Sequence, residues 1–437
     1  MGELLAIKGG KRTVPEGLAV KWPVITEEHR KLVNEVLDSG VLCGAYAPQV
    51  KALEREFREY IGADYCLAMN SGTAALHAAI SAAGIGPGDE VITSAFTFLA
   101  SALAVLQHNA IPRFVDIDPK TYNIDPKKIE EKINEKTKAI MPVHIHGLPA
   151  DMDEIMAIAK KYGLVVIEDA CQAHGAEYKG RKAGTIGDMG TFSLNTTKNM
   201  PGGEGGLFIT DSKELYIKAN MFRMFGEDIE DPSEGKFSIH NPYEDTREYN
   251  AYILGWNYRS QELPAAFARG ALKNLDLWNA NARRNAEFLT RELSKIKGVI
   301  PPTCPPDRTH IYHKYRVRLD TKALGVDMEP AKFRDKVRAA LQAEGVAAVL
   351  WQTRVLPKQT LFERMEGYGR GCPWTCPHAR QARDYREEEF PETQRLLDDS
   401  IVICSQSYPI FPQKLELMEY YVEAFHKVFD NLDQVVS

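Results

Sequence analysis

The sequence predicts an α/β fold with a mostly parallel sheet covered by helices, followed by a smaller C-terminal α+β unit. From about residue 28 to 215, helical and β-rich segments alternate, and such repetition builds a parallel sheet with helices on both faces. The run LVVI at 164–167 is apolar throughout, which is typical of a strand buried on both sides. After GVIPPTCPPDRTH at 298–310, a strand-like segment and a helical one follow. We therefore predict an N-terminal segment at 1–27, a large domain at 28–270 and a small domain at 271–437.

The elements of the large domain follow from local signals. A helix is expected at 26–40, where TEEHRKLVNEVLDSG begins on a Thr cap and ends at a Gly. Short β-rich runs predict strands, and the segments between them predict helices. The strands are expected at 89–96, 111–118, 138–147 and 163–170, and the helices at 100–109, 125–134 and 151–163.

The C-terminal part shows longer elements. A helical stretch with few breakers covers 265–296, a strand is expected in HKYRVRLD at 313–320, and a helix is expected at 329–345. Two segments at about 226–250 and 366–392 are predicted to be loops.

Composition restricts the class of protein. Hydrophobic residues make up 44% of the 437 residues, and the net charge is −6, from 54 basic and 60 acidic residues. There is no basic block, so a nucleic-acid or acidic-membrane surface is not expected. No apolar run approaches the roughly 18 residues that span a bilayer, and the charged N-terminus does not resemble a signal peptide. Seven scattered cysteines favour reduced thiols, so we expect a cytoplasmic protein.

NSGTAALHAAISAAG at 70–84 places Asn, Ser, Gly and Thr directly before an alanine-rich helix. Backbone amides at a helix N-terminus, with the Ser71 and Thr73 hydroxyls beside them, form a site suited to a phosphate. The alternative is a helix that is merely well capped, because Asn and Ser are preferred caps.

VVIEDACQAHG at 165–175 places two carboxylates at the end of a buried strand. Successive side chains of a strand alternate between faces, so Glu168 and Asp169 cannot both point into one cleft. Asp169 either caps the next turn or pairs with a buried cationic nitrogen, whose protonated form it would stabilise.

Lys198 lies in FSLNTTKNMPGGEGG at 192–206, which holds four glycines just after it. A nucleophilic lysine needs a loop that holds it inside a site and lowers its pKa, and glycines permit a tight backbone path beside a ligand. The alternative is a solvated loop lysine.

No metal site is predicted. His144 and His146 are expected on the same side of one strand, where packing or hydrogen bonding is favoured over metal binding. Cys372, Cys376 and His378 in CPWTCPH supply three possible zinc ligands, but no fourth ligand is evident, and a free-thiol loop is favoured.

Several stretches, in chain order, resemble the DegT/DnrJ/EryC1/StrS family of sugar and cyclitol aminotransferases, fold-type I enzymes that depend on pyridoxal 5′-phosphate (PLP). The similarity runs from about residue 17 to the end. The motifs are SGTAAL at 71–76, SAFTFLA at 94–100, EDACQAHGA at 168–176, FSLNTTKN with the following GEGG, and LGWNYRSQELPAAFARGAL at 254–272. The resemblance implies a PLP-binding large domain with a seven-stranded sheet.

The resemblance also implies residue roles. Lys198 would hold PLP as an internal aldimine and then move the proton between substrate and cofactor. Asp169 would keep the pyridine nitrogen protonated, so that the ring acts as an electron sink. Phe98 would stack on the ring and Gln172 would approach its 3′-oxygen. The phosphate would be held by Gly72, Thr73 and Ser193, and by Asn257 of a neighbouring subunit in a homodimer with interfacial sites.

The implied reaction is a ping-pong transfer of an amino group from L-glutamate or L-glutamine, through pyridoxamine 5′-phosphate, to a nucleotide-linked keto-sugar or a keto-cyclitol. Asn195 and Thr196 stand where the family often has His-Pro, which favours a subgroup such as the enzymes that aminate cyclitol ketones. Two alternatives are a dehydratase-like enzyme, whose relatives carry His in place of Lys198, and a binding or sensory protein on the same fold.

Overall fold

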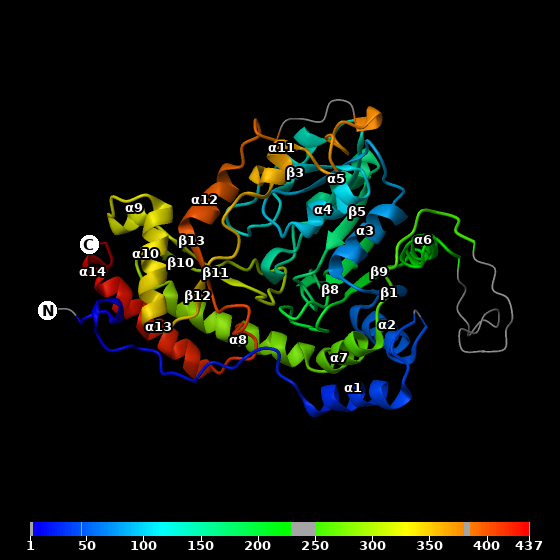
Figure 1. Ribbon diagram of the computed structural model, residues 1–437. Helices are drawn as coiled ribbons and strands as arrows, with labels where there is room; N and C mark the ends of the chain where they lie inside the picture. The colour runs from blue at the N-terminus through cyan, green and yellow to red at the C-terminus, as the bar shows by residue number, and fades with distance from the viewer. Residues whose placement is uncertain (1–2, 45, 229–249, 380–384, 437) are drawn as a thin grey trace.

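A seven-stranded sheet forms the centre of the larger part of the molecule in the computed structural model, which describes residues 3–44, 46–228, 250–379 and 385–436 (Figure 1). The strand order is β1 (Tyr65–Met69), β9 (Gly206–Thr210), β8 (Met189–Ser193), β5 (Val165–Asp169), β4 (Thr137–Met141), β2 (Glu90–Ser94) and β3 (Ile111–Val115). The strands from β8 to β3 are parallel, and β9 runs antiparallel to both its neighbours. The prediction of a mostly parallel sheet is confirmed.

Helices cover both faces of this sheet because neighbouring apolar residues of each strand point to opposite sides. Ile167 packs in the cluster that contains the helices α3 and α6, whereas Val166 packs in the cluster that contains α5. The helices of this part are α1 (Glu27–Ser39), α2 (Pro48–Ile61), α3 (Gly72–Ala82), α4 (Ala100–Gln107), α5 (Met152–Tyr162) and α6 (Lys213–Arg223). The hairpin β6 (Glu177–Tyr178) and β7 (Arg181–Lys182) lies between β5 and β8 in sequence.

A second sheet is antiparallel, with the order β10 (Val299–Ile300), β11 (Tyr315–Leu319), β13 (Ser400–Ile403) and β12 (Ala348–Val349). Around it lie α8 (Leu275–Leu293), α9 (Thr321–Leu324), α10 (Pro330–Ala343), α12 (Pro391–Asp399), α13 (Leu415–Asp430) and α14 (Leu432–Val436). The short helix α11 (Thr360–Arg364) instead packs on the first sheet, where Phe362 contacts Phe114 of β3. One cluster of buried apolar side chains continues from α2 through α8 to this sheet, so the two sheets share a core. The division of the chain at residues 27 and 270 stays a prediction.

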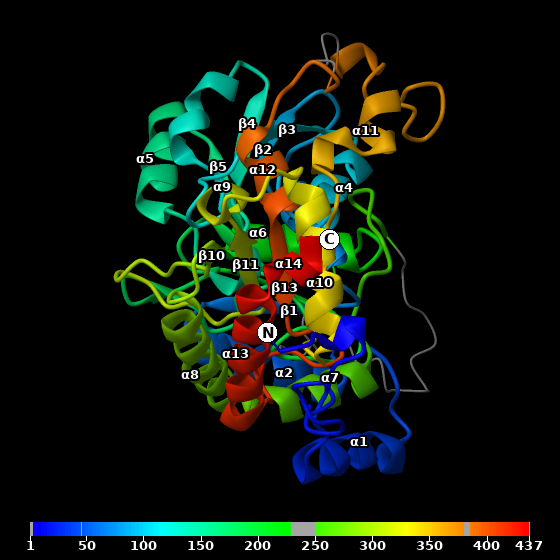
Figure 2. The same cartoon turned by 90° about the vertical axis from the view of Figure 1, so that its left-hand side faces the viewer.

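The two chain termini meet beside α10 (Figure 2). The Leu5 amide donates to Gln434 Oε1 over 3.0 Å, and Glu344 at the end of α10 accepts from the amides of Ala6 and Thr13. The N-terminal segment is therefore fixed to the C-terminal part before it reaches α1.

Three expectations about elements are wrong. The stretch at 125–134 forms two 3-10 turns, Pro126–Lys128 and Glu130–Lys132, because beyond Pro126 and Ile129 its largely charged residues offer little to bury. The helical stretch at 265–296 is two helices, α7 (Glu262–Leu272) and α8, because α7 packs on α1 and α2 whereas α8 packs on α13. His144 and His146 do not share a strand, since β4 ends at Met141 and His146 adopts a φ of 58° in a 3-10 turn.

The other predicted elements are confirmed within a few residues, including α1 with its Thr26 cap, β11 and α10. The predicted loop at 226–250 lies mostly outside the described residues.

Candidate active site

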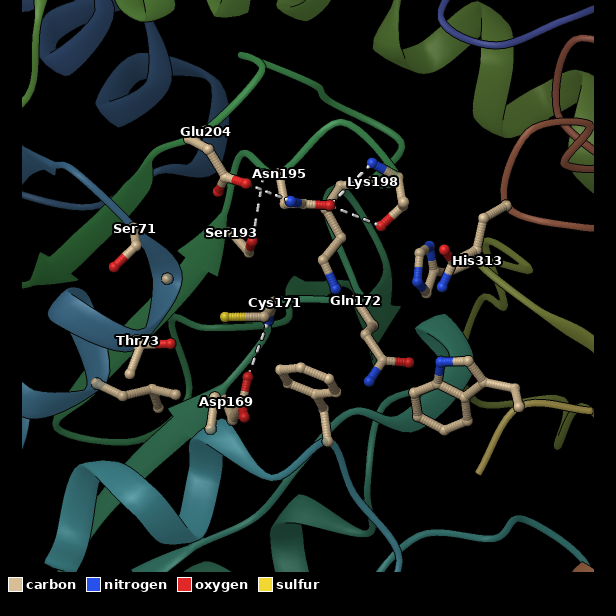
Figure 3. Close-up of a pocket in the computed structure, with 17 residues that line it drawn as sticks. Ser71, Thr73, Asp169, Cys171, Gln172, Ser193, Asn195, Lys198, Glu204 and His313 are labelled. Atoms are coloured by element: carbon tan, nitrogen blue, oxygen red, sulfur yellow. Dashed lines mark hydrogen bonds between the residues drawn. The ribbon is translucent and has the colours of Figure 1, made fainter. Parts of the chain in front are cut away.

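A cavity of about 260 Å³ lies beyond the carboxyl ends of β5 and β8, where ligands bind in parallel α/β sheets (Figure 3). It brings together seven of the eight predicted site residues: Gly72, Thr73, Phe98, Asp169, Gln172, Ser193 and Lys198. Figure 3 shows Ser71 and Thr73 on one side of the cavity and His313 on the opposite side. The sequence motifs therefore converge on one place, although they are spread over about 130 residues of chain.

Lys198 lies in the loop between β8 and β9, and the loop is closed by short-range hydrogen bonds. The Lys198 amide donates to the Asn195 carbonyl over 2.9 Å, and the Gly202 amide donates to the Leu194 carbonyl over 2.6 Å. Gly203 and Gly205 adopt φ values of 90° and 142°, which favour glycine. Burial lowers the pKa of the Lys198 amine, while Cys171 and Asp169 act in the opposite direction. The loop thus presents an amine with an increased neutral fraction to the cavity.

Asp169 ends β5 and is buried at the bottom of the cavity. Its carboxylate accepts from the Ser101 hydroxyl over 2.7 Å and from the Cys171 amide over 3.2 Å. Two donors fix the carboxylate but leave lone pairs free, so it can pair with a cationic N–H inside the cavity.

Glu168 points away from the cavity, as the alternation along β5 predicts. Its carboxylate accepts from His144 over 2.8 Å and from the amides of Gly184, Ile186 and Gly187. Burial raises the pKa of Glu168, but these hydrogen bonds outweigh it, and the pKa is lowered overall. Glu168 and His144 therefore have a structural role, and hydrogen bonding of His144 is confirmed.

The N-terminus of α3 forms one wall of the cavity. Ser71 caps the helix, with its hydroxyl accepting from the Ala74 amide over 3.0 Å. The first amides of a helix, here those of Gly72 and Thr73, have no intrahelical partner and attract anions. A Cβ at Gly72 would lie 2.8 Å from the Ser193 Cβ, so only glycine lets helix and strand approach this closely. The Ser193 hydroxyl accepts from the Asn195 amide and can donate to an anion.

These residues fit PLP. The α3 N-terminus and Ser193 match a phosphate, and Asp169 matches a protonated ring nitrogen. The Phe98 side chain is 51% exposed although it lines the cavity, so its ring face is available for stacking. Gln172 accepts from the His146 amide through its oxygen, which leaves its NH₂ group to donate.

Asn257 does not line this cavity. Its side chain is exposed, and its carbonyl accepts from Asn70 over 3.3 Å. Around it lie the exposed apolar side chains of Phe225, Tyr252, Leu254 and Trp256. Asn257 thus lies at the surface and does not line the cavity of its own chain, although its partner Asn70 immediately precedes Ser71 of the cavity wall.

Residues of the C-terminal part complete the cavity, and sequence reasoning missed them. His313, Trp351 and Gln406 line it together with Asn195 and Glu204, whose side chains are joined by a 2.8 Å hydrogen bond. Burial lowers the pKa of His313, and the charge of Lys314 lowers it further, so His313 is neutral. The only sequence signal was the position of His313 as the first residue of a predicted strand, since Trp351 and Gln406 belong to no recognisable motif.

Cys372, Cys376 and His378 do not come together with a fourth ligand. Within the described ranges, no group of three or more His, Cys, Asp or Glu side chains is arranged to hold a metal ion. The same ranges contain no helix with the length and apolar character needed to cross a membrane.

Comparison with known proteins agrees with this geometry. The model of the DegT/DnrJ/EryC1/StrS aminotransferase family matches residues 23–397. The chain is 35% identical to a pleiotropic regulatory protein of Geobacillus stearothermophilus, over 93% of this chain and 95% of that protein. It is 33% identical to the L-glutamine:scyllo-inosose aminotransferase of Streptomyces griseus over the full length of both. The crystal structure of an aminotransferase from Psychrobacter cryohalolentis superposes with a TM-score of 0.81 at 29% identity, covering 95% of this chain and all of the other.

Proposed function

The chain belongs to the DegT/DnrJ/EryC1/StrS aminotransferase family, and on that premise we propose that it moves an amino group from L-glutamate or L-glutamine to a keto-cyclitol or a nucleotide-linked keto-sugar. The observation that carries the proposal is the convergence of Lys198, Asp169, Phe98 and the α3 N-terminus on one cavity. PLP is the cofactor that this set of groups fits.

Each protein group has a role toward that cofactor. Gly72, Thr73 and Ser193 would hold the phosphate, Phe98 would stack on the ring, and Gln172 would donate to the ring hydroxyl oxygen. Bound PLP supplies an electron sink for charge that develops at the substrate carbon. Asp169, fixed by Ser101 and Cys171, would hold a proton on the ring nitrogen.

Lys198 provides the amine that binds the cofactor and then carries the proton. Because burial lowers the pKa of this amine, more of it is neutral near pH 7 than for a solvated lysine, and a neutral amine can accept a proton from the substrate carbon. The same amine returns the proton in the other direction when the acceptor reacts. Donor and acceptor would use the one cavity in turn, as a ping-pong route requires.

The cavity lining favours a polyhydroxylated acceptor. Asn195 and Glu204 present an amide and a carboxylate that can bind hydroxyl groups, and Trp351 adds an apolar face. The Streptomyces griseus relative that matches along its whole length is named for a cyclitol ketone, which supports a keto-cyclitol as the first acceptor to test. A nucleotide-linked keto-sugar is the second candidate.

The active unit is proposed to be a homodimer in which Asn257 serves the cavity of the neighbouring subunit. The exposed position of Asn257 and the apolar side chains around it support this arrangement, since contiguous exposed apolar residues mark interaction surfaces.

An absorbance spectrum of the purified protein with PLP tests the proposal, recorded before and after L-glutamate or L-glutamine is added alone. We expect the band of the lysine-bound cofactor to be replaced by that of pyridoxamine 5′-phosphate with one of the two donors. A bound cofactor that neither donor changes would favour a dehydratase-like enzyme or a binding protein, the second candidate class, to which the regulatory name of one relative draws attention.

A further inference from the structure

A second cavity, of about 360 Å³, lies directly beside the active-site cavity. Trp351 and Gln406 line both cavities, so these two side chains form the shared wall. The second cavity is further lined by Ser405 and Ser407, by the apolar Val349, Leu350 and Val402, and by Lys314. None of these residues is acidic.

Lys314 reaches this cavity because of its place in the chain. It immediately follows His313 and precedes β11, at a bend in the backbone. His313 lines the first cavity and Lys314 lines the second. Two consecutive residues thus line two adjoining cavities.

Lys314 is buried without a counterion. Its side chain is only 4% exposed, and in the described part of the chain it makes no hydrogen bond or ion pair. The other buried lysine of that part, Lys427, bonds to the Lys11 carbonyl and to Glu344. Burial lowers the pKa of Lys314 to about 7, and repulsion by Lys198 acts in the same direction. A protonated lysine in this position is costly unless an anion pairs with it.

We propose that the second cavity is an oxyanion subsite of the active site, in which the Lys314 ammonium binds a carboxylate or phosphate oxygen of a substrate. The assignment rests on the proposed function. The oxyanion belongs either to the carboxylate of the amino donor or to the diphosphate of a nucleotide-linked acceptor. Ser405, Ser407 and Gln406 supply neutral donors beside the ammonium, and such donors strengthen the binding of an oxyanion.

Three variants test the subsite. Lys314→Met removes the charge at nearly constant volume, Lys314→Arg retains the charge, and Lys427→Met is the control for removing a buried lysine elsewhere. With PLP-loaded protein, we expect Lys314→Met to raise the KM for the substrate that carries the oxyanion, either the amino donor or the nucleotide-linked acceptor, at least about tenfold with a much smaller change in kcat, because a ground-state charge pair is lost. Lys314→Arg should restore most of the affinity, and Lys427→Met should leave the KM unchanged.

Binding measurements separate the two sources of the oxyanion. Calorimetry with glutarate, and separately with uridine, guanosine and thymidine diphosphates, should show a loss of affinity in Lys314→Met for one class only. Loss for glutarate assigns the donor carboxylate, and loss for the diphosphates assigns the acceptor. Equal binding of all probes and an unchanged KM in Lys314→Met would overturn the subsite.

These titrations also distinguish failure of the subsite from failure of the proposed function. Binding of glutarate or a nucleoside diphosphate depends on Lys314 whether or not the protein transfers amino groups. A protein that binds one of them through Lys314 but does not convert either donor retains the subsite and loses the proposed reaction. Melting temperatures show whether each variant is folded. Lys314→Met should be at least as stable as wild type because it removes an unpaired buried charge, whereas Lys427→Met should be less stable because it breaks the contacts with Lys11 and Glu344.

Discussion

At the scale of residues, the site consists of side chains that hydrogen bonds and burial have prepared for different charge states. The Asp169 carboxylate accepts hydrogen bonds from the Ser101 hydroxyl and the Cys171 amide, and it can still pair with a cation. Burial lowers the pKa of Lys198, so this residue can act as a neutral amine. The carboxylate of Glu168, the immediate neighbour of Asp169, accepts hydrogen bonds from His144 and from backbone amides outside the cavity, so it has a structural role. The neighbouring carboxylates of Glu168 and Asp169 therefore differ in role because their hydrogen-bond partners differ.

Lys198→Ala should abolish turnover while the protein stays folded. Loss of the amine removes both the covalent anchor for PLP and the proton carrier, so we expect the rate to fall by at least about 10³-fold. The rate is measured with donor and acceptor, and circular dichroism with a thermal melt serves as the check of folding. Retained transamination in this variant would refute the role of Lys198.

Asp169→Ala should retain some cofactor but lose most of the rate, because the ring nitrogen is no longer held protonated. Cofactor content is measured from absorbance, and the donor half-reaction is followed by rapid mixing. Ser101→Ala, which removes one of the two hydrogen bonds to Asp169, should be impaired less. A rate near wild type for Asp169→Ala would mean that another group protonates the ring.

Lys314→Met should change the pH dependence of stability in a defined direction. The pKa of Lys314 is about 7 in the folded protein against an ordinary 10.5, so between these values the unfolded chain binds more protons. The loss in the free energy of unfolding that results from burying Lys314 is complete below about pH 7, and it disappears as the pH rises toward 10.5. Among neighbouring groups Lys198 and Arg316 disfavour its charge and Cys404 favours it. Denaturant unfolding at several pH values should show the advantage of Lys314→Met shrinking as the pH rises, and a constant difference would contradict the low pKa.

At the scale of elements, the approach of α3 to β8 decides whether a phosphate can be held. The helix N-terminus supplies amides and the strand supplies Ser193, and only a glycine at position 72 allows the two to meet. The Lys198 loop then begins where β8 ends, so the same strand carries both the proposed phosphate ligand Ser193 and the loop that holds the Lys198 amine.

Gly72→Ala should therefore weaken PLP binding by about tenfold or more, since the new Cβ would lie 2.8 Å from the Ser193 Cβ and force helix and strand apart, at a cost of about 1–3 kcal/mol. The affinity is measured by titrating protein freed of cofactor with PLP. Gly86→Ala is a matched control, because a Cβ there meets nothing within 4 Å. Equal affinities in both variants would show that the close approach has no part in binding.

At the scale of the whole molecule, the C-terminal part supplies His313, Trp351 and Gln406 to a cavity whose other walls belong to the large sheet. The core that continues between the two sheets fixes these parts against each other. In the proposed homodimer, Asn257 would extend the same principle to a second copy of the chain, because its side chain is exposed and does not line its own cavity.

Mixing two inactive variants tests that extension. Lys198→Ala and Asn257→Ala subunits, unfolded together and refolded, should form mixed dimers with one intact site, and about a quarter of wild-type activity should return for random pairing. Asn257 contacts Asn70 through its carbonyl, so the side-chain change leaves that contact in place. Each variant refolded alone is the control, and no recovery in the mixture would show that Asn257 does not act across subunits.

The sequence by itself determined the α/β class, the mostly parallel sheet, and Gly72, Thr73, Asp169 and Lys198 as candidate site residues. These depend on local rules, namely the alternation along β5, the cap at Ser71 and the glycines after Lys198, and local rules act on neighbours in the chain. The resemblance of the motifs added Phe98, Gln172 and Ser193, together with the roles of all seven residues that meet in the cavity.

Only the tertiary structure decided what lies opposite those motifs. The break between α7 and α8 depends on which helices each half packs against, and Trp351 and Gln406 reach the cavity through contacts across more than 100 residues of chain. In the sequence, Lys314 is the second residue of the strand predicted at 313–320. Its burial, its lack of a counterion and its place beside the active site result from long-range packing, which no periodicity or spacing encodes.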